Sequence, residues 1–226
     1  MQASPFSPLA LRYPSSFPYL VFAGPCSAET EEQTYATAKA LRAGGVRFFR
    51  ASLWKPRTRP GSFEGVGREG LPWLRRIEEE LGMQVATEVA SASHVEEALR
   101  AGLNTFWIGA RTTTSPFAVA ELAEALSGED VTVLVKNPLN PDIELWEGAL
   151  LRLKSAGVDR IAAIHRGFST YGKGFYRNAP LWQIPIELRR RHPALTILVD
   201  PSHISGRRDL VPLVSRIGLE MNFSGL

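Results

Sequence analysis

The chain has 226 residues, of which 44% are hydrophobic and 22% are charged, and this balance supplies enough apolar side chain for one well-buried globular domain. A net charge of +3 is mild, so nucleic acid is not expected as a partner, and no apolar run approaches the roughly 20 residues of a membrane helix. The single cysteine, Cys26, excludes an intrachain disulfide, and the Pro- and Ser-rich start lacks the pattern of a signal peptide. We therefore expect a soluble cytoplasmic protein.

Residues 1–18 read as an irregular N-terminal arm, and residues 19–226 as one domain in which apolar runs alternate with helical stretches. The predicted strands are 19–23, 46–52, 85–90, 105–110, 131–136, 161–165 and 195–200. The predicted helices are 29–43, 71–81, 93–102, 115–126, 143–156, 181–191 and 208–219. Two helix starts have a cap signal: Ser93 and Glu96 have the spacing of a capping box, and Ser115 is followed by Pro116.

Seven strand–helix units predict the α/β class with a parallel sheet, and their number favours a closed (β/α)8 TIM-type barrel. An open doubly wound sheet is the rival, but no strand is followed by the glycine-rich turn of a dinucleotide site. Gly65 and Gly67 lie in a loop after the second strand, and we interpret them as a flexible turn rather than a phosphate cradle.

In a barrel, the residues that follow each strand converge at one end, where active sites lie. Six permanently cationic side chains hold such positions: Arg50, Lys55, Arg57, Arg111, Lys136 and Arg166. Six converging cations would repel one another strongly unless the site binds polyanions, and the arginine fork matches phosphate and carboxylate groups. The substrates are therefore predicted to carry several negative charges.

Cys26 and His203 follow the first and seventh strands, and a thiolate with an imidazole can bind one divalent transition-type metal of the Mn, Fe, Co or Zn kind. The alternative is an inert cysteine and a hydrogen-bonding histidine. Glu88 is open between a metal ligand, an acid–base group and the partner of a neighbouring cation, the last being favoured. His165 either faces the site beside Arg166 or packs toward the helices.

Six motifs in the same order resemble those of 3-deoxy-D-arabino-heptulosonate 7-phosphate (DAHP) synthase, the first enzyme of the shikimate pathway, which leads to the aromatic amino acids. They are Gly24-Pro-Cys-Ser27, Lys55-Pro-Arg-Thr58, Gly109-Ala-Arg111, Val135-Lys136, His165-Arg-Gly167 and Asp200-Pro-Ser-His-Ile-Ser-Gly-Arg207. The text around Glu88 and Trp182 is similar to the branch often fused to a chorismate mutase domain.

The resemblance implies a metal-dependent condensation of phosphoenolpyruvate with erythrose 4-phosphate, giving DAHP and phosphate, by an enzyme expected to be a homo-oligomer. It implies that Arg111, Lys136 and Arg166 hold phosphoenolpyruvate, with Lys55 beside them. Arg57 and Thr58 match the motif that faces erythrose 4-phosphate, and Cys26 and His203 match two of the family's four metal ligands. Lys55 is our candidate for protonating the new alkoxide.

The sequence departs from the family at its end, because the other two metal ligands, a Glu on strand eight and an Asp beyond it, would follow residue 226. Residues 222–226 stand where strand eight should begin, so we expect a truncated barrel that lacks most of this strand and its helix, with unpaired edges on the first and seventh strands. Two alternatives stay open: a 3-deoxy-D-manno-octulosonate 8-phosphate synthase, for which we expect Lys-Ala-Asn-Arg-Ser at Lys55, and a non-catalytic phosphoenolpyruvate-binding module.

Overall fold

The computed structural model describes residues 4–11, 17–55, 61–172 and 174–226. Its contacts divide the chain into two compact units. The amino-terminal unit spans Leu11–Trp107, and the carboxy-terminal unit spans Ile108–Leu226 together with Met1–Ala10, the first part of the predicted arm. Each unit repeats the same alternation of strand and helix, which is the predicted α/β class.

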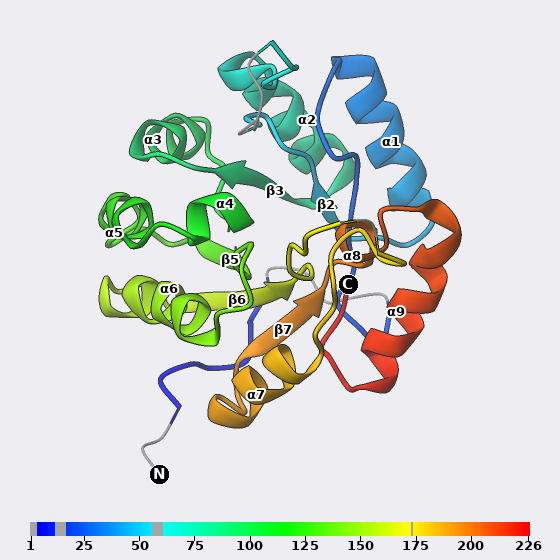
Figure 1. Cartoon of the computed structure of the whole chain (residues 1–226). Helices are drawn as coiled ribbons and strands as arrows, with labels where there is room; N and C mark the ends of the chain where they lie inside the picture. Colours follow the sequence, from blue (N-terminus) through cyan, green and yellow to red (C-terminus); the bar gives the residue numbers. More distant parts are fainter. Residues whose placement is uncertain (1–3, 12–16, 56–60, 173) are drawn as a thin grey trace. The chain divides into compact units, whose positions relative to one another are not determined.

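Eight elements follow one another in the amino-terminal half of the chain. They are β1 (Phe22–Ala23), α1 (Glu31–Ala43), β2 (Phe48–Arg50), the 3-10 turn η1 (Gly67–Gly70), α2 (Leu71–Leu81), β3 (Gln84–Val89), α3 (Ala92–Arg100) and β4 (Thr105–Ile108). β2 pairs in parallel with both β1 and β3. Helices α1 and α2 pack side by side (Figure 1).

The helix boundaries of this unit follow from local chemistry. Thr30 caps α1, since its hydroxyl accepts a hydrogen bond from the Gln33 N–H (3.1 Å). α2 has the predicted bounds, and Gly82 ends it in the left-handed conformation, at φ +59°. The predicted capping box at Ser93 is wrong: α3 is capped two residues earlier by Ser91, whose hydroxyl accepts from the His94 N–H.

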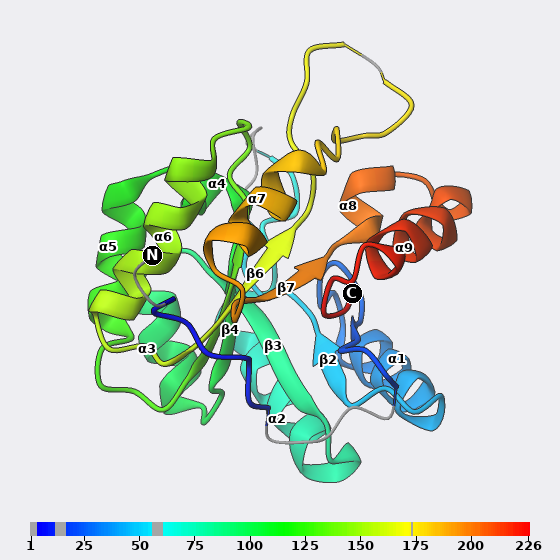
Figure 2. The same ribbon diagram turned by 90° about the horizontal axis from the view of Figure 1, so that it is seen from below.

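The carboxy-terminal unit continues the alternation (Figures 1 and 2). Its elements are α4 (Ala110–Thr113), α5 (Pro116–Ala125), β5 (Thr132–Lys136), α6 (Ile143–Ser155), β6 (Arg160–His165), α7 (Gln183–Arg191), β7 (Thr196–Val199), α8 (Pro201–Ser205), the 3-10 turn η2 (Arg208–Leu210) and α9 (Val211–Glu220). β6 pairs in parallel with β5 and with β7. The predicted cap of α5 is confirmed, because Ser115 Oγ accepts from the Ala118 N–H. The short helices α4 and α8 were not predicted.

The strands of both units are buried, as parallel strands covered on both faces should be. Every residue of β3, β4, β5 and β7 is buried, and the tertiary core is completed by helix side chains such as Trp146 and Leu74, which are fully enclosed. β5 ends in Lys136, Glu88 is the last residue but one of β3, and Asp200 directly follows β7, so these strands deliver polar side chains at their carboxyl ends. No helix of the described ranges is long and apolar enough to span a membrane.

The end of the chain lies alongside β7. Leu198 and Gly225 form a parallel bridge, the Ser224 N–H donates to the Ile197 carbonyl (2.9 Å), and the Val199 N–H donates to the Gly225 carbonyl (2.9 Å). Residues 224–225 therefore pair with β7 as the start of an eighth strand would. The prediction that the edge of β7 is unpaired is wrong. Phe223, 2% exposed, fixes this segment in the core.

The described part of the arm packs on the carboxy-terminal unit. Phe6 is 5% exposed and stands edge-on to the His192 ring, with 5.0 Å between ring centroids. The Leu9 N–H donates to Thr196 Oγ1 (2.9 Å), at the first residue of β7. The arm therefore lies at the amino end of this strand, opposite the end that carries the predicted site residues.

Candidate functional site

At the carboxyl end of β1, Cys26 lies beside Lys55. The Lys55 ammonium donates a hydrogen bond to Cys26 Sγ over 3.1 Å, and the thiol is exposed. The Lys55 backbone N–H donates to the Glu64 carbonyl (2.8 Å), which fixes the start of the loop after β2. An ammonium next to sulfur favours the thiolate, which is both the nucleophilic and the metal-binding form of cysteine.

Arg50 ends β2 and packs against the turn that carries Cys26. Its guanidinium donates to the Pro25 carbonyl (3.3 Å) and lies 5.9 Å from the centroid of the Trp107 ring. Gly24 makes this approach possible, because a Cβ at its φ of +156° would overlap the Arg50 carbonyl. The glycine of the Gly24-Pro-Cys motif is thus required by packing against Arg50.

Glu88 lies near the carboxyl end of β3 and is 9% exposed. Its carboxylate accepts a hydrogen bond from Ser52 Oγ (3.3 Å), and the same hydroxyl contacts the Trp54 carbonyl at 2.5 Å. Glu88 therefore belongs to the polar end of β3, beside the segment that leads to Lys55. Arg57 and Thr58, the predicted contacts of erythrose 4-phosphate, lie outside the described residues.

In the carboxy-terminal unit, Asp200 joins two predicted site residues. Its Oδ2 lies 3.1 Å from Lys136 Nζ at the end of β5 and 2.7 Å from His203 Nδ1 in α8. Its Oδ1 accepts from the His203 N–H (3.1 Å) and caps α8. Asp200 raises the pKa of His203, but burial together with the Lys136 and Arg166 charges outweighs it, so the net shift is downward.

Arg166 follows β6 and is 7% exposed. Its guanidinium donates to the Gly167 carbonyl (3.2 Å) and to Asn178 Oδ1 (2.9 Å), and its backbone N–H donates to Asn137 Oδ1 (2.7 Å). Burial lowers the pKa of Arg166 to about 10, opposed by Asp200 and assisted by the charges of Arg177 and Arg111. The side chain stays cationic at neutral pH.

Arg111 lies in α4, directly after β4, and is exposed. Its positive charge helps to lower the pKa of Arg166, so the two guanidinium groups interact electrostatically. With Lys136, they are three cations of the carboxy-terminal unit, which follow or end β4, β5 and β6. A group of like charges held at one sheet edge is suited to bind a multiply charged anion.

His165 packs toward the helices and not toward a ligand. The side chain is fully buried among the rings of Trp146, Phe168 and Trp182, at centroid distances of 6.4, 5.8 and 5.0 Å. Neither ring nitrogen has a hydrogen-bond partner within the described residues, although the Pro180 carbonyl lies near. Burial lowers the pKa of His165 to about 3. Of the two interpretations left open by the sequence, the structure favours the core position of His165, and its two ring nitrogens lack hydrogen-bond partners among the described residues.

The two predicted metal ligands, Cys26 and His203, each lie beside a charged side chain that suits metal binding. Within the ranges that the structure describes, no three His, Cys, Asp or Glu side chains gather closely enough to hold a metal ion. The residues present nevertheless fit ligation: Lys55 favours the thiolate of Cys26, and Asp200 lies on Nδ1 of His203, as carboxylates do behind metal-bound histidines, which leaves Nε2 for the metal.

Three polar residues that position these groups were given no role from the sequence: Asp200, which was recognised only as part of a motif, Asn137 and Asn178. Asp200 and Asn137 directly follow β7 and β5, so an acid or amide at a strand end was the available signal. Asn178 lies in a long connection and had no such signal.

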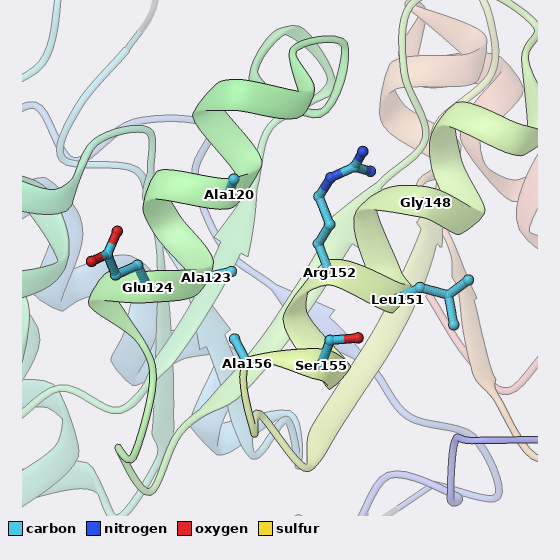
Figure 3. A pocket seen from close by; sticks show the side chains of 8 residues that line it. All are labelled: Ala120, Ala123, Glu124, Gly148, Leu151, Arg152, Ser155 and Ala156. Atoms are coloured by element: carbon cyan, nitrogen blue, oxygen red, sulfur yellow. The ribbon is translucent and has the colours of Figure 1, made fainter.

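A groove of about 600 Å³ lies away from the strand ends, between α5 and α6 (Figure 3). It is lined by Ala120, Ala123, Glu124, Gly148, Leu151, Arg152, Ser155 and Ala156. None of the predicted site residues is among them, and the lining is mostly small and aliphatic. The convergence of charge at the strand ends therefore identifies the candidate site better than this hollow does.

Comparisons with known proteins agree with the motifs. The model of the DAHP synthetase I family matches residues 16–226. A phospho-2-dehydro-3-deoxyheptonate aldolase of Thermotoga maritima is 32% identical over 208 residues, which are 92% of this chain and 60% of the relative. A 2-dehydro-3-deoxyphosphooctonate aldolase of Variovorax paradoxus is 29% identical over 92% of this chain and 78% of the relative.

Solved structures give the same result. The crystal structure of the Thermotoga maritima DAHP synthase superposes with a TM-score of 0.80 at 31% identity, covering 92% of this chain and 59% of that one. A truncated form of the Thermotoga maritima enzyme gives 0.77 at 28% identity, covering 72% of its chain. The predicted TIM-type barrel class is thus confirmed by its match to these neighbours. The chain spans about 60% of the length of its Thermotoga relative, and with these matches it belongs to the DAHP synthetase I family.

Proposed function

We propose that this chain forms a carbon–carbon bond between phosphoenolpyruvate and erythrose 4-phosphate, giving DAHP and phosphate. The observation that carries the proposal is the buried set at the ends of β5, β6 and β7: Lys136 on Asp200, Asp200 on His203, and the enclosed cation Arg166. Membership in the family supports the same reaction class.

The cations bind the negative charges of the substrates. We assign Arg111, Lys136 and Arg166 to the carboxylate and phosphate of phosphoenolpyruvate. The sequence motifs assign Lys55, and the strand-end pattern assigns Arg50, to substrate binding as well. Glu88 balances positive charge at the same strand ends. Arg57 and Thr58 are proposed to bind the phosphate of erythrose 4-phosphate.

By their match to the family motifs, Cys26 and His203 would each be a ligand of a divalent metal of the Mn, Fe, Co or Zn kind. When bound, the metal supplies Lewis-acid polarisation of the aldehyde carbonyl. The Lys55 ammonium would favour the thiolate of Cys26, and Asp200 orients the His203 ring. Metal binding would require the thiolate of Cys26 and the neutral imidazole of His203.

In the reaction, C3 of phosphoenolpyruvate bonds to the aldehyde carbon, and the aldehyde oxygen becomes an alkoxide. Lys55 gives this alkoxide a proton. Attack by C3 leaves C2 electron-deficient, and water adds there and loses one proton. The new hydroxyl then gives its second proton to the departing phosphate and becomes the ketone oxygen as the bond from C2 to the phosphate oxygen breaks. The guanidinium groups stabilise the charge on the carboxylate and on the departing phosphate throughout.

Purified protein incubated with phosphoenolpyruvate, erythrose 4-phosphate and Mn²⁺ tests the proposal through the release of phosphate. The expected result is release that requires erythrose 4-phosphate, stops with a chelator and is lost in Lys55→Met. Near-normal turnover of Lys55→Met with both substrates saturating would exclude its role as proton donor. A matched control is Lys39→Met, an exposed lysine of α1.

A second aldose is a specific alternative, because the Variovorax paradoxus relative is a 2-dehydro-3-deoxyphosphooctonate aldolase. Phosphate release with arabinose 5-phosphate, but not with erythrose 4-phosphate, would assign the chain to that chemistry. The Lys55-Pro-Arg-Thr58 sequence favours erythrose 4-phosphate.

The remaining alternative is a binding module. Calorimetric binding of phosphoenolpyruvate without turnover under added Mn²⁺ would support it, and metal-dependent phosphate release would exclude it. The homo-oligomer and the cytoplasmic location also stay predictions, and light scattering of the purified protein tests the first.

A further inference from the structure

We propose that Asn178 is a positioning residue that couples the Arg166 guanidinium to the segment that carries His203. It lies in the connection between β6 and α7 and is 5% exposed. Its Oδ1 accepts a hydrogen bond from the Arg166 guanidinium (2.9 Å), and its Nδ2 donates to the His203 carbonyl (2.6 Å). One amide therefore contacts both the anion-binding and the metal-binding segments of the carboxy-terminal unit.

The amide can adopt only one orientation. A guanidinium has donors alone, so it must meet the amide oxygen, and a carbonyl accepts alone, so it must meet the amide NH₂. Turning the amide over would set donor against donor and acceptor against acceptor. Both contacts thus support each other, and losing one weakens the other.

The backbone holds Asn178 in place from two sides. Its N–H donates to the Ile204 carbonyl (3.2 Å) in α8, and on its other side Ala179 and Phe168 exchange two hydrogen bonds of 2.8 Å. In Figure 2 the connection leaves β6, extends outward and comes back beside α8. Gly167 lets it close tightly, since a Cβ at its φ of +77° would lie 2.9 Å from Asn178 Cβ.

A neutral amide suits this position better than an acid does. Arg166 keeps its full charge for a substrate anion while one of its N–H groups is directed by Asn178 Oδ1. A carboxylate in the same place would neutralise that charge and would also face the His203 carbonyl. Asn178 therefore orients the cation without competing with the anion.

The inference rests on the proposed role of Arg166 in binding phosphoenolpyruvate. The test is calorimetric binding of phosphoenolpyruvate to the full chain in the presence of chelator, so that no turnover occurs. Asn178→Ala is expected to raise the Kd about tenfold, the effect of one hydrogen bond to a charged group. Asn178→Asp is expected to raise it at least as much. The exposed Asn140→Ala is the control and should leave the Kd unchanged.

A double-mutant cycle separates positioning from a general structural role. If Asn178 acts through Arg166, then Asn178→Ala in an Arg166→Ala background should change the Kd less than about twofold, because the partner is already gone. A further tenfold loss in that background, or a Kd within about twofold of wild type for Asn178→Ala alone, would overturn the inference.

Thermal unfolding of each variant shows that it is folded, and Asn178→Ser replaces Asn178→Ala in the cycle if the alanine variant is not.

The proposed function and the coupling by Asn178 would be contradicted by different results. Binding of phosphoenolpyruvate without turnover on erythrose 4-phosphate would overturn the proposed function and leave the coupling measurable. Unchanged binding by Asn178→Ala beside normal turnover would overturn only the inference, and no binding by wild type would overturn both.

Discussion

Lys136 Nζ and Asp200 Oδ2 form a 3.1 Å ion pair whose two side chains are each only 11% exposed. The pair connects the end of β5 to the residue that caps α8. A cation and an anion this far removed from water depend on each other, because removing one takes a full opposite charge away from the other. A change that breaks the pair is therefore expected both to destabilise the unit and to move the side chains of the proposed site.

Asp200→Asn should destabilise the protein by about 2 to 4 kcal/mol, since Lys136 keeps a hydrogen-bond partner but loses its counter-charge. Asparagine is as good a helix cap as aspartate, so α8 is expected to keep its start. Urea unfolding measures the change. Asp159→Asn is the control, because Asp159 is 84% exposed and water screens its ion pair with Lys154, so its loss should be much smaller. Equal losses in both variants would contradict the argument.

The buried ring of His165 predicts a loss of stability in acid. The folded state keeps this histidine neutral down to a pKa of about 3, with Arg166 lowering the pKa and Asp200 raising it. The unfolded chain protonates histidine near pH ~6.5, so below that value it binds more protons than the folded state. Stability from this group is complete above pH ~6.5 and is lost as the pH falls toward ~3.

His165→Leu removes this titration. Its free energy of unfolding should fall less steeply between pH ~6.5 and ~4.5 than that of wild type, whose slope includes up to ~1.4 kcal/mol per pH unit from this group. Urea unfolding at a series of pH values measures both curves. Parallel curves would show that the ring of His165 is not the proton-sensitive group.

Lys55→Met should slow the alkylation of Cys26 by iodoacetamide several-fold, because the ammonium 3.1 Å from Sγ no longer favours the thiolate. Cys26 is the only cysteine, so mass spectrometry reports it without ambiguity. Lys39→Met is again the control and should react like wild type. If the metal binds this sulfur, Mn²⁺ or Zn²⁺ should also protect it in wild type.

Gly65→Ala should destabilise the protein far more than Gly61→Ala. Both glycines have positive φ, +100° and +79°, so both substitutions strain the backbone by about 1 kcal/mol. A Cβ at Gly65 would also overlap the Leu53 carbonyl, whereas one at Gly61 has open space. Thermal unfolding compares them, and equal melting temperatures would show that the loop relaxes freely. Gly65 thus allows this loop to pack on Leu53, which follows β2 in the chain.

Local pattern determined much of what the structure contains. The periodicity of α2 and the cap of α5 gave their boundaries, because both depend on residues within a few positions of each other. The short helices α4 and α8 were not predicted, because their four and five residues are too few to show a helical period. The cap of α3 was misplaced by two residues because Ser91 and Ser93 offer the same chemistry.

The sequence by itself determined the α/β alternation, the cations that follow the strands and the family, since each of these is written in residue type and order. Tertiary structure alone decided that Asp200 contacts both Lys136 and His203, and that His165 lies in the core. It also decided that Asn178 links Arg166 to the carbonyl of His203, which lies 25 residues after Asn178. These relationships join segments distant in the chain, and only the path of the backbone brings such segments within reach of a hydrogen bond.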